Sequence, residues 1–544
     1  MEPAECGIGN PIIPGTGAKV QQELDYQGAF GLRFARYYNS SGSGKPVVSE
    51  ERSDGKLGLV WRSSIDKHLY TGIASSYTSA AMTLPNGSLE YFTPAGNEVL
   101  GISLNRGKLG SGNVYLSDSG VDQFDAEGRL VLTSTVSGQV TRIKYSDGTL
   151  GAGGGYIVDS NGNATDQALP SGVAIGMEDA VGHSIRFSYD ARLRLVKMTT
   201  PGGADYLYSY DNNDNLVSIR YPDGRTRLYH YGESQYTGGS YRDADLPNAL
   251  TGITDENGVR YVNFSYFYSY GGYYDSSVRA VGEEYPAAGT NTNRYQFSYT
   301  NRYFSSSSPY QTVVTDPLGT ARTYNFQTIN GVARSTGTNQ PGGSGCGASS
   351  NSLTYDTNGN VASRTDFNGN QTKYTYDSGG RNLEVQRREG LTRDGSVRPE
   401  TRTISTQWHS DWRLPVKIAE PRKLTTYVYN GDTDPATGSV LTCAPAGATL
   451  PALSGGTVPI GVLCKKTEQA TTDTNGAAGL SPTASGTGRT WKWTYNAQGQ
   501  VLTADGPRTD VADITTYTYY DATDADQGRR GQLATITNAL GYLT

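Results

Sequence analysis

The sequence predicts an all-β fold in which short hairpins stack into one long, curled sheet. A Tyr-Asp dipeptide recurs at a constant spacing, since Tyr189, Tyr210 and Tyr231 are each 21 residues apart. Glycine, asparagine and aspartate follow it at fixed offsets, and β-branched and aromatic residues fill the runs between. A constant period of this size is typical of proteins built from stacked supersecondary units.

The clearest unit spans 355–377 and contains two turn signatures, Asp-Thr-Asn-Gly-Asn at 356–360 and Asp-Phe-Asn-Gly-Asn at 366–370. Aspartate at the first turn position accepts a bond from the backbone two residues on, and glycine supplies the positive φ of a tight reversal. The runs after the turns are therefore predicted strands, Val361–Thr365 and Gln371–Tyr376. The residues that define the repeat are Tyr189, Asp190, Tyr210, Asp211, Gly224, Tyr231, Tyr355, Asp356, Gly359, Gly369, Tyr376 and Asp377.

Tyrosine is the main aromatic residue, with 40 tyrosines against 11 phenylalanines. A phenol has an apolar body and a hydroxyl that needs a partner or water. A lone hairpin is marginally stable, so each unit is expected to bury one face against its neighbours. We predict sheet faces that are packed and partly hydrated, with a curled sheet enclosing a wet inner surface.

The chain divides into four predicted segments. Residues 1–95 form a distinct N-terminal module, and 96–182 form irregular β repeats. Regular repeats with loops occupy 183–350, and repeats with long insertions occupy 351–544. The last residues stop inside a repeat, so further repeats of the same polypeptide are expected to follow.

Composition excludes several function classes. The net charge is −6, with 46 basic and 52 acidic residues and no long basic run, which argues against a nucleic-acid partner. No apolar stretch is long enough to span a membrane, and the N-terminus lacks the basic and apolar segments of a signal peptide. Export is expected to use another route, or the chain begins after such a signal.

Cys443 and Cys464 bracket a loop rich in glycine, proline and alanine. A disulfide between them would close a segment that otherwise has little to hold it. Two buried thiols are the alternative, since pairing is not readable from spacing. The cysteine spacing fits no zinc site, because there is no Cys-x-x-Cys and no nearby histidine pair.

No catalytic, cofactor or metal site is predicted. The four histidines (68, 183, 230 and 409) are scattered, without a metal-binding or catalytic motif. The Asp-Asn runs at the turns resemble the start of a calcium loop but lack its glycine and terminal glutamate, so turn chemistry explains them better. Trp408 and Trp412 are a candidate aromatic platform for glycans, with core packing as the favoured alternative.

The Tyr-Asp-x-x-Gly-Asn units resemble the YD repeats of the Rhs (rearrangement hotspot) family. The segment GNPIIPGTGAKVQQELDY, from Gly9 to Tyr26, looks like the module that opens many bacterial Rhs proteins. The resemblance implies a sheet that winds spirally into a hollow shell around a variable C-terminal toxin. The DPxGL core segment of the family, with its self-cleaving aspartates, is not found, and the look-alike at Asp316 has an altered order.

The predicted function is a non-enzymatic shell segment of an exported protein, secreted or held at the cell surface. It would enclose and deliver a C-terminal toxin or effector of the same polypeptide in intercellular competition or host interaction. A secretion apparatus and cell-surface glycans are further candidate partners. The alternative is a cell-surface adhesion or carbohydrate-binding β-repeat protein.

Overall fold

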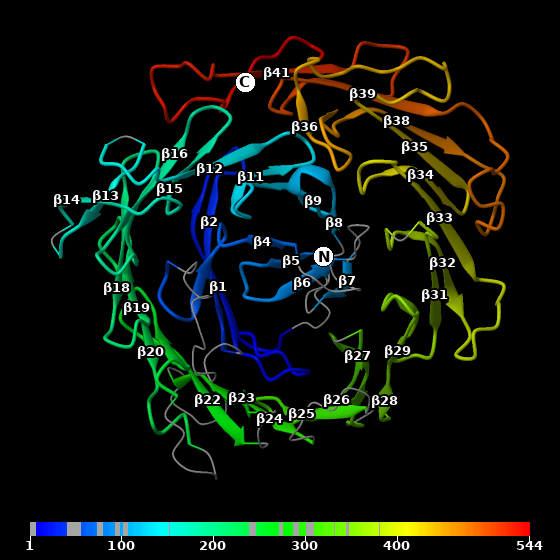
Figure 1. Cartoon of the computed structure of the whole chain (residues 1–544). Helices are drawn as coiled ribbons and strands as arrows, with labels where there is room; N and C mark the ends of the chain where they lie inside the picture. Colours follow the sequence, from blue (N-terminus) through cyan, green and yellow to red (C-terminus); the bar gives the residue numbers. More distant parts are fainter. Residues whose placement is uncertain are drawn as a thin grey trace.

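The computed structural model describes residues 7–40, 56–72, 80–92, 98–101, 107–151, 153–160, 162–238, 246–270, 276–286, 293–300, 309–330, 332–343, 347–379 and 381–544. It is built almost entirely of antiparallel β-strands, as the sequence predicts. Figure 1 shows most strands arranged as a curved wall around a smaller N-terminal group of strands.

The N-terminal module comprises the described part of residues 7–101 and contains two small sheets. Its strands are β1 (Val20–Gln27), β2 (Arg33–Asn39), β3 (Trp61–Ser63), β4 (His68–Thr71), β5 (Ala80–Thr83), β6 (Leu89–Phe92) and β7 (Glu98–Gly101). Strands β1 to β3 form one sheet and β4 to β7 the other. Strand β7 pairs with β6 at the edge of the second sheet.

The wall begins with a long run of paired strands that contains the regular repeats. Its members are β8 (Lys108–Leu109), β9 (Val114–Leu116), β10 (Gly120–Phe124), β11 (Leu130–Thr135), β12 (Val140–Tyr145), β13 (Tyr156–Val158), β14 (Ala164–Ala168), β15 (Ala174–Asp179), β16 (Ser184–Tyr189), β17 (Leu195–Thr199), β18 (Asp205–Tyr210), β19 (Leu216–Arg220), β20 (Thr226–Tyr231), β21 (Leu250–Thr254), β22 (Arg260–Tyr270), β23 (Ser276–Glu284), β24 (Arg294–Tyr299), β25 (Tyr310–Thr315), β26 (Ala321–Ile329), β27 (Val332–Gln340) and β28 (Ser349–Ser350). A short 3₁₀ turn, η3 (Ser111–Asn113), precedes β9.

Neighbours along this run are antiparallel, as expected for chain reversals through tight turns. One irregularity occurs early, where β12 pairs directly with β15 and the hairpin β13–β14 stands aside. That hairpin stays attached through a parallel contact between β13 and β16.

The second part of the wall is a 12-stranded sheet within the described residues. Its members are β29 (Ser352–Tyr355), β30 (Val361–Thr365), β31 (Gln371–Tyr376), β32 (Glu384–Leu391), β33 (Arg402–Trp408), β34 (Pro415–Glu420), β35 (Lys423–Tyr429), β38 (Leu463–Ala470), β39 (Arg489–Tyr495), β40 (Val501–Asp505), β41 (Ile514–Tyr519) and β42 (Leu533–Thr537). The predicted strands Val361–Thr365 and Gln371–Tyr376 are confirmed as β30 and β31.

The two parts of the wall are continuous. Strand β28 passes into β29 through Asn351, whose N–H donates to the carbonyl of Thr338 at 3.1 Å. The change from the first sheet to the second falls between Ser350 and Ser352. Between β35 and β38 lies an insertion, residues 430–462, which carries the hairpin β36 (Thr449–Pro451) and β37 (Thr457–Pro459).

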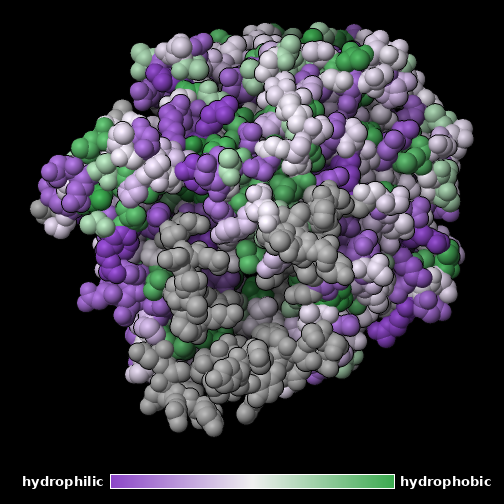
Figure 2. All heavy atoms as spheres, in the orientation of Figure 1, coloured by the Kyte–Doolittle hydropathy of each residue, from purple (hydrophilic) through white to green (hydrophobic). Residues whose placement is uncertain are grey.

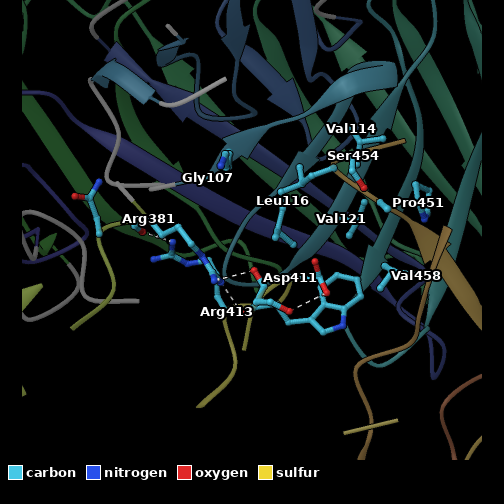
Figure 3. Close-up of a pocket in the computed structure, with 16 residues that line it drawn as sticks. Gly107, Val114, Leu116, Val121, Arg381, Asp411, Arg413, Pro451, Ser454 and Val458 are labelled. Atoms are coloured by element: carbon cyan, nitrogen blue, oxygen red, sulfur yellow. Dashed lines mark hydrogen bonds between the residues drawn. The ribbon is translucent and has the colours of Figure 1, made fainter. Parts of the chain in front are cut away.

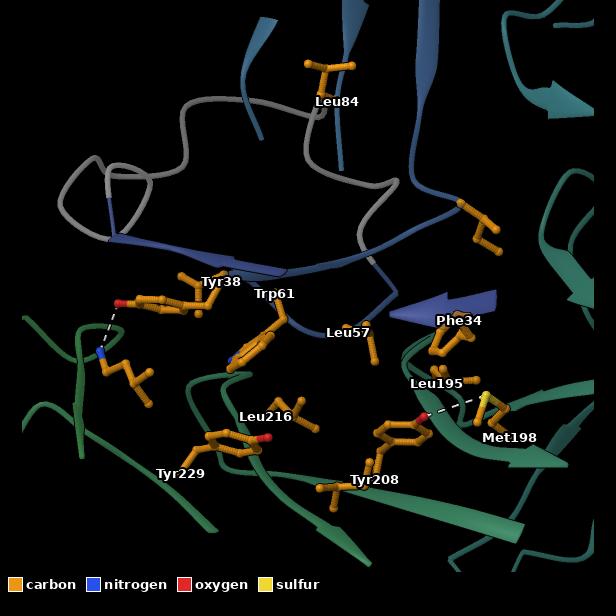
Figure 4. Packing of buried hydrophobic residues seen from close by; sticks show 14 of the residues in the cluster. Phe34, Tyr38, Leu57, Trp61, Leu84, Leu195, Met198, Tyr208, Leu216 and Tyr229 are labelled. Atoms are coloured by element: carbon orange, nitrogen blue, oxygen red, sulfur yellow. Dashed lines mark hydrogen bonds between the residues drawn. The ribbon is translucent and has the colours of Figure 1, made fainter. Parts of the chain in front are cut away.

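The larger core lies between the N-terminal module and the wall. Figure 4 shows Phe34, Tyr38 and Trp61 of the module packed against Leu195, Tyr208 and Tyr229 of the wall. All six side chains are buried. The outer surface is mixed, and Figure 2 shows hydrophilic residues interspersed with hydrophobic ones over the described part of one face.

Candidate functional site

The tyrosine of each repeat locks its hairpin to the preceding one. A β-bulge precedes Tyr210, which pairs with Leu216 on the next strand. The hydroxyl of Tyr210 donates to the carbonyl of Leu195 at 2.7 Å, and Leu195 is the residue that pairs with the preceding repeat tyrosine, Tyr189. The next unit repeats this geometry, since Tyr231 donates to Leu216 at 2.8 Å.

The same bond recurs along the wall. The hydroxyls donate from Tyr189 to Ala174 at 2.6 Å, from Tyr355 to Ser335 at 2.5 Å, from Tyr376 to Val361 at 3.0 Å and from Tyr519 to Val501 at 2.9 Å. Burial raises the pKa of Tyr189, Tyr210 and Tyr231 well above the ordinary tyrosine value. For these residues the partner that a buried hydroxyl needs is a backbone carbonyl.

The aspartate that follows the tyrosine organises the turn. In the turn at 356–360, Oδ1 of Asp356 accepts the N–H groups of Asn358 and Asn360 at 2.9 and 2.8 Å. The amide of Asn360 donates to Oδ2 of the same carboxylate at 2.9 Å. Gly359 lies between Asn358 and Asn360 and has φ of +77°, a backbone conformation that favours glycine.

Other turns use the same arrangement. Asp190 accepts from the N–H groups of Arg192 and Arg194, and Asp211 from those of Asn213 and Asn215. In the turn that begins at Asp211, Asp214 has the positive φ, which is 60°. In their own turns, Gly224 and Gly369 have the positive φ, with values of 85° and 83°. In Asp377 the Oδ1 atom accepts from Leu383 N at 2.7 Å.

These bonds satisfy the carboxylates with backbone donors. Burial alone would raise the pKa of Asp366, but hydrogen bonds from Asn370, Asn368 and Gly369 hold it below its ordinary value. Asp316, the look-alike of a cleavage residue, is also a turn carboxylate, bonded to Leu318 N and Thr320 N. Within the described part of the chain, no group of three or more metal-binding side chains is present.

The N-terminal module is joined to the wall by a buried polar network. Arg36 on β2 and Asp25 on β1 form an ion pair at 2.7 Å, and both side chains are 0% exposed. The wall completes it, because Tyr208 donates to Asp25 at 2.8 Å and Arg36 donates to the hydroxyl of Tyr229 at 3.1 Å. Burial opposes charge on Arg36, yet the adjacent Asp25 raises the pKa of Arg36 well above its ordinary value.

A second buried polar group lies near the start of the module. The Lys19 ammonium donates to the carbonyl of Val20 and to Oε1 of Gln21, each at 2.7 Å, and lies 4.3 Å from the Phe264 ring centre. Burial lowers the pKa of Lys19 to about 7, against the opposing field of Glu283 on β23. Glu283 accepts the N–H of Asn10 at 2.8 Å, which also ties the module to the wall.

A loop near the C-terminal end of the wall contacts a turn near its N-terminal end. Residues 520–532, the segment between β41 and β42 that we call the lap, contact the β15–β16 turn, where His183 Nε2 lies 2.7 Å from the carbonyl of Gln527. The other ring nitrogen of His183 lies 2.8 Å from Oδ2 of Asp179. The insertion adds a further contact, since Gly461 N donates to Val136 O at 2.8 Å. The described wall thus closes around the module through loop contacts (Figure 1).

The insertion is fastened by a disulfide between Cys443 and Cys464, one of the two arrangements that the sequence leaves open. Trp412 is 3% exposed and packs in a cluster with apolar residues of the insertion and of strands β9 and β10. The indole N–H of Trp408 donates to Glu384 O at 2.8 Å. The burial of Trp412 agrees with core packing, the favoured alternative to a glycan platform of Trp408 and Trp412.

The four histidines have structural contacts and lie on different elements, His68 on β4 of the module and the other three in the wall. His409 accepts the N–H groups of Asp411 and Trp412 at Nδ1, each at 3.0 Å, and its Nε2 lies 3.0 Å from Asp432. His230 contacts the hydroxyl of Thr254 at 2.8 Å. Helices that are long and apolar enough to cross a membrane are absent from the described residues.

Two family models match the chain. The RHS Repeat model matches residues 189–226 and 355–392, and a domain of unknown function, DUF6531, matches residues 9–92. The matches confirm the resemblance seen in the repeats and in the N-terminal segment. No curated protein matches the chain.

Solved structures with a similar chain path are toxin-complex proteins. A crystal structure of TcdB2-TccC3-TEV has a TM-score of 0.40 and 12% identity, over 85% of this chain and 23% of that one. The Tc holotoxin pore of Photorhabdus luminescens has a TM-score of 0.31 and 10% identity, over 95% of this chain and 29% of that one. The chain thus spans less than a third of the length of these structures' chains.

Proposed function

Because the chain carries Rhs repeats behind a DUF6531 domain, we propose that it is the non-enzymatic wall of a container for a C-terminal toxin or effector of the same polypeptide. The container would keep that cargo from the producing cell and release it during competition or contact with a host. The protein would be exported, with a secretion apparatus as its partner.

The observation that carries this proposal is the enclosure itself. The wall curves around the N-terminal module, and the lap reaches the β15–β16 turn, 344 positions earlier in the chain. The tyrosine hydroxyls and turn aspartates of the repeats serve this architecture, because they bond to backbone groups. Polar side chains that are hydrogen-bonded to the backbone stabilise the wall, and this suits containment better than catalysis.

Protease protection tests the proposal. The polypeptide encoded by the whole reading frame is treated with a nonspecific protease, and cleavage of the region after the repeats is followed over time. Containment predicts that this region survives in the intact protein and is degraded quickly when expressed alone. Equal rates of degradation in the two forms would contradict containment.

The biological role needs a second experiment. A producer strain and a strain lacking only the region after the repeats are each mixed with a susceptible competitor. The proposal predicts that the competitor loses viability only beside the complete producer. Equal survival beside both strains would remove the role in competition and leave a wall without an established cargo.

A further inference from the structure

A partly enclosed cavity of about 230 Å³ lies where the first strands of the wall meet its later loops. The residues that line it come from β8 to β10, from the loops β31–β32 and β33–β34, and from the β36–β37 hairpin (Figure 3). The volume is enough for several water molecules or for one small organic group. The disulfide at Cys443–Cys464 fastens the insertion that supplies the hairpin, so this side of the cavity is fixed covalently.

One side of the cavity is apolar. Val114, Leu116 and Val121 come from β9 and β10, and Val458 comes from the hairpin. The three wall residues are at most 5% exposed, and they belong to the same cluster as Trp412, which also lines the cavity. Such a surface favours a branched aliphatic or aromatic group of a ligand.

The opposite side presents two guanidinium groups. Arg381 donates to the carbonyls of His409, Ser410 and Trp412 at 2.6, 2.9 and 2.8 Å. Arg413 donates to the carbonyl of Arg381 at 2.7 Å and pairs with Asp118. These bonds hold both cations in place beside the apolar surface.

Arg381 forms no direct ion pair among the described residues. Its three acceptors are neutral carbonyls. A guanidinium has five N–H donors, so two of its donors remain for a ligand or solvent. Burial, together with the neighbouring Arg413, lowers the pKa of Arg381, and the fields of Asp377 and Asp411 oppose this shift only in part.

The charges around the cavity disfavour a ligand with two negative charges. Lys108, Arg381 and Arg413 are cationic, whereas Asp411 lines the cavity, Asp118 is the partner of Arg413 and Asp377 lies near Arg381. Three positive and three negative groups balance, so the cavity has no excess positive charge for a dianion. A monoanionic carboxylate matches the planar fork of the Arg381 guanidinium, whereas a phosphate dianion would be repelled by Asp411.

We propose that this cavity binds an apolar group that carries one carboxylate, with the carboxylate at Arg381 and the apolar group against Val114, Leu116 and Val121. Two sources share this chemistry, a free small acid and the carboxyl terminus of a peptide. The site is independent of any cargo, because all of its residues belong to the wall and its insertion.

Calorimetric titration of the whole chain with N-acetyl-leucine tests the proposal, with the neutral N-acetyl-leucinamide as the matched control. We expect a dissociation constant of about 1 mM or below for the acid. The amide should bind at least about tenfold more weakly, because it lacks the charge-assisted bond. Equal affinities for the two compounds, or no heat from the acid, would overturn the proposal.

Two variants locate the site. Arg381→Gln should lower the affinity for the acid about tenfold or more and leave the amide unchanged. Because Arg381 also holds the 409–412 loop, a second variant, Val458→Phe, reduces the cavity without touching the cation and should weaken binding of both compounds. Unchanged affinity for the acid in both variants would place its binding elsewhere and overturn the assignment.

Peptides distinguish the two sources. A tetrapeptide ending in leucine with a free carboxylate is compared with its C-terminal amide and with N-acetyl-leucine. Tighter binding of the free peptide than of either compound identifies a chain terminus as the ligand. Binding of N-acetyl-leucine without binding of the peptide identifies a free small acid.

Discussion

At the scale of single residues, the repeat tyrosine has two functions that phenylalanine cannot combine. Its ring is buried in the wall, and its hydroxyl satisfies a carbonyl beside the bulge of the preceding hairpin, as for Tyr210 and Leu195. An unpaired buried carbonyl costs free energy, so the bond supplies a reason for tyrosine at this position. It also explains the constant period, because each hydroxyl must reach the preceding unit.

Replacing Tyr210 by phenylalanine should therefore destabilise the wall. We expect the free energy of unfolding to fall by about 1–3 kcal/mol, since the Leu195 carbonyl loses its donor in a buried site. Tyr156→Phe on β13 is the matched control, because Tyr156 is 45% exposed. Chemical denaturation followed by far-ultraviolet circular dichroism measures both variants, and equal midpoints would show that the hydroxyl bond contributes nothing.

Lys19 predicts a pH dependence at the same scale. Its pKa is about 7 in the folded protein because of burial, and 10.5 is the ordinary value that applies to the unfolded chain. Between these values the unfolded chain binds a proton that the folded chain does not, so the free energy of unfolding rises with pH. One group contributes a slope of up to about 1.4 kcal/mol per pH unit.

The variant Lys19→Met should remove this rise, measured as the denaturation midpoint from pH about 7 to about 9, below the range where tyrosines ionise. The raised pKa of Glu283 acts in the opposite direction, over a range that begins at its ordinary value of 4.5. Lys144→Met, on an exposed lysine of β12, is the control and should keep the wild-type slope. A wild-type slope in Lys19→Met would contradict the assignment.

At the scale of elements, the turn after each Tyr-Asp pair requires a side-chain oxygen more than a charge. Asn496 and Asn538 accept the same pair of backbone N–H groups, two and four residues on, as Asp356 and Asp366 do. Both residue types place an oxygen three bonds from Cα, where it can reach these donors.

Asp366→Asn should therefore leave the β30–β31 hairpin nearly intact, whereas Asp366→Ala should destabilise it by about 1 kcal/mol through loss of the two bonds. Hydrogen exchange of the amides of Asn368 and Asn370 reports the turn directly. Fast exchange is expected in the alanine variant and near wild-type exchange in the asparagine variant. Equal protection in both variants would show that the side-chain oxygen is dispensable.

The hairpins were predictable because their signals are local. Strands β30 and β31 start and end at the predicted residues, since the Asp-x-Asn-Gly-Asn turns fix their ends. The partner of the tyrosine hydroxyl was not predictable, because it depends on a bulge in the register. Core packing was the favoured role of Trp412 from the sequence, but its neighbours Leu116 and Leu450 could not be named, since they lie in different parts of the chain.

At the scale of the whole molecule, enclosure depends on contacts between distant segments. Arg36 and Tyr229 are 193 positions apart, and His183 and Gln527 are 344 apart. No periodicity in the sequence encodes such pairs. The sequence resemblance implied a spiral wall. Only the structure shows that the module lies inside the wall and that the lap contacts the β15–β16 turn.

The lap provides a test of closure. Gly531 has φ of +66°, and a Cβ atom there would lie 2.1 Å from Cζ of Phe30 in the module. Gly541 has a similar φ of +81°, but a Cβ atom there would meet nothing within 4 Å. The two glycines therefore share the backbone strain of an alanine substitution and differ in the contact with the module.

We expect Gly531→Ala to displace the lap from Phe30 while the repeat hairpins stay folded. Hydrogen exchange should become at least about tenfold faster in residues 520–532, since local opening then costs less free energy. The strand amides of β17 to β20 should keep their protection, and Gly541→Ala should leave the lap unchanged. If the lap keeps wild-type protection in Gly531→Ala, the contact with Phe30 does not hold the wall closed. The His183–Gln527 contact and the insertion would then have to account for the closure.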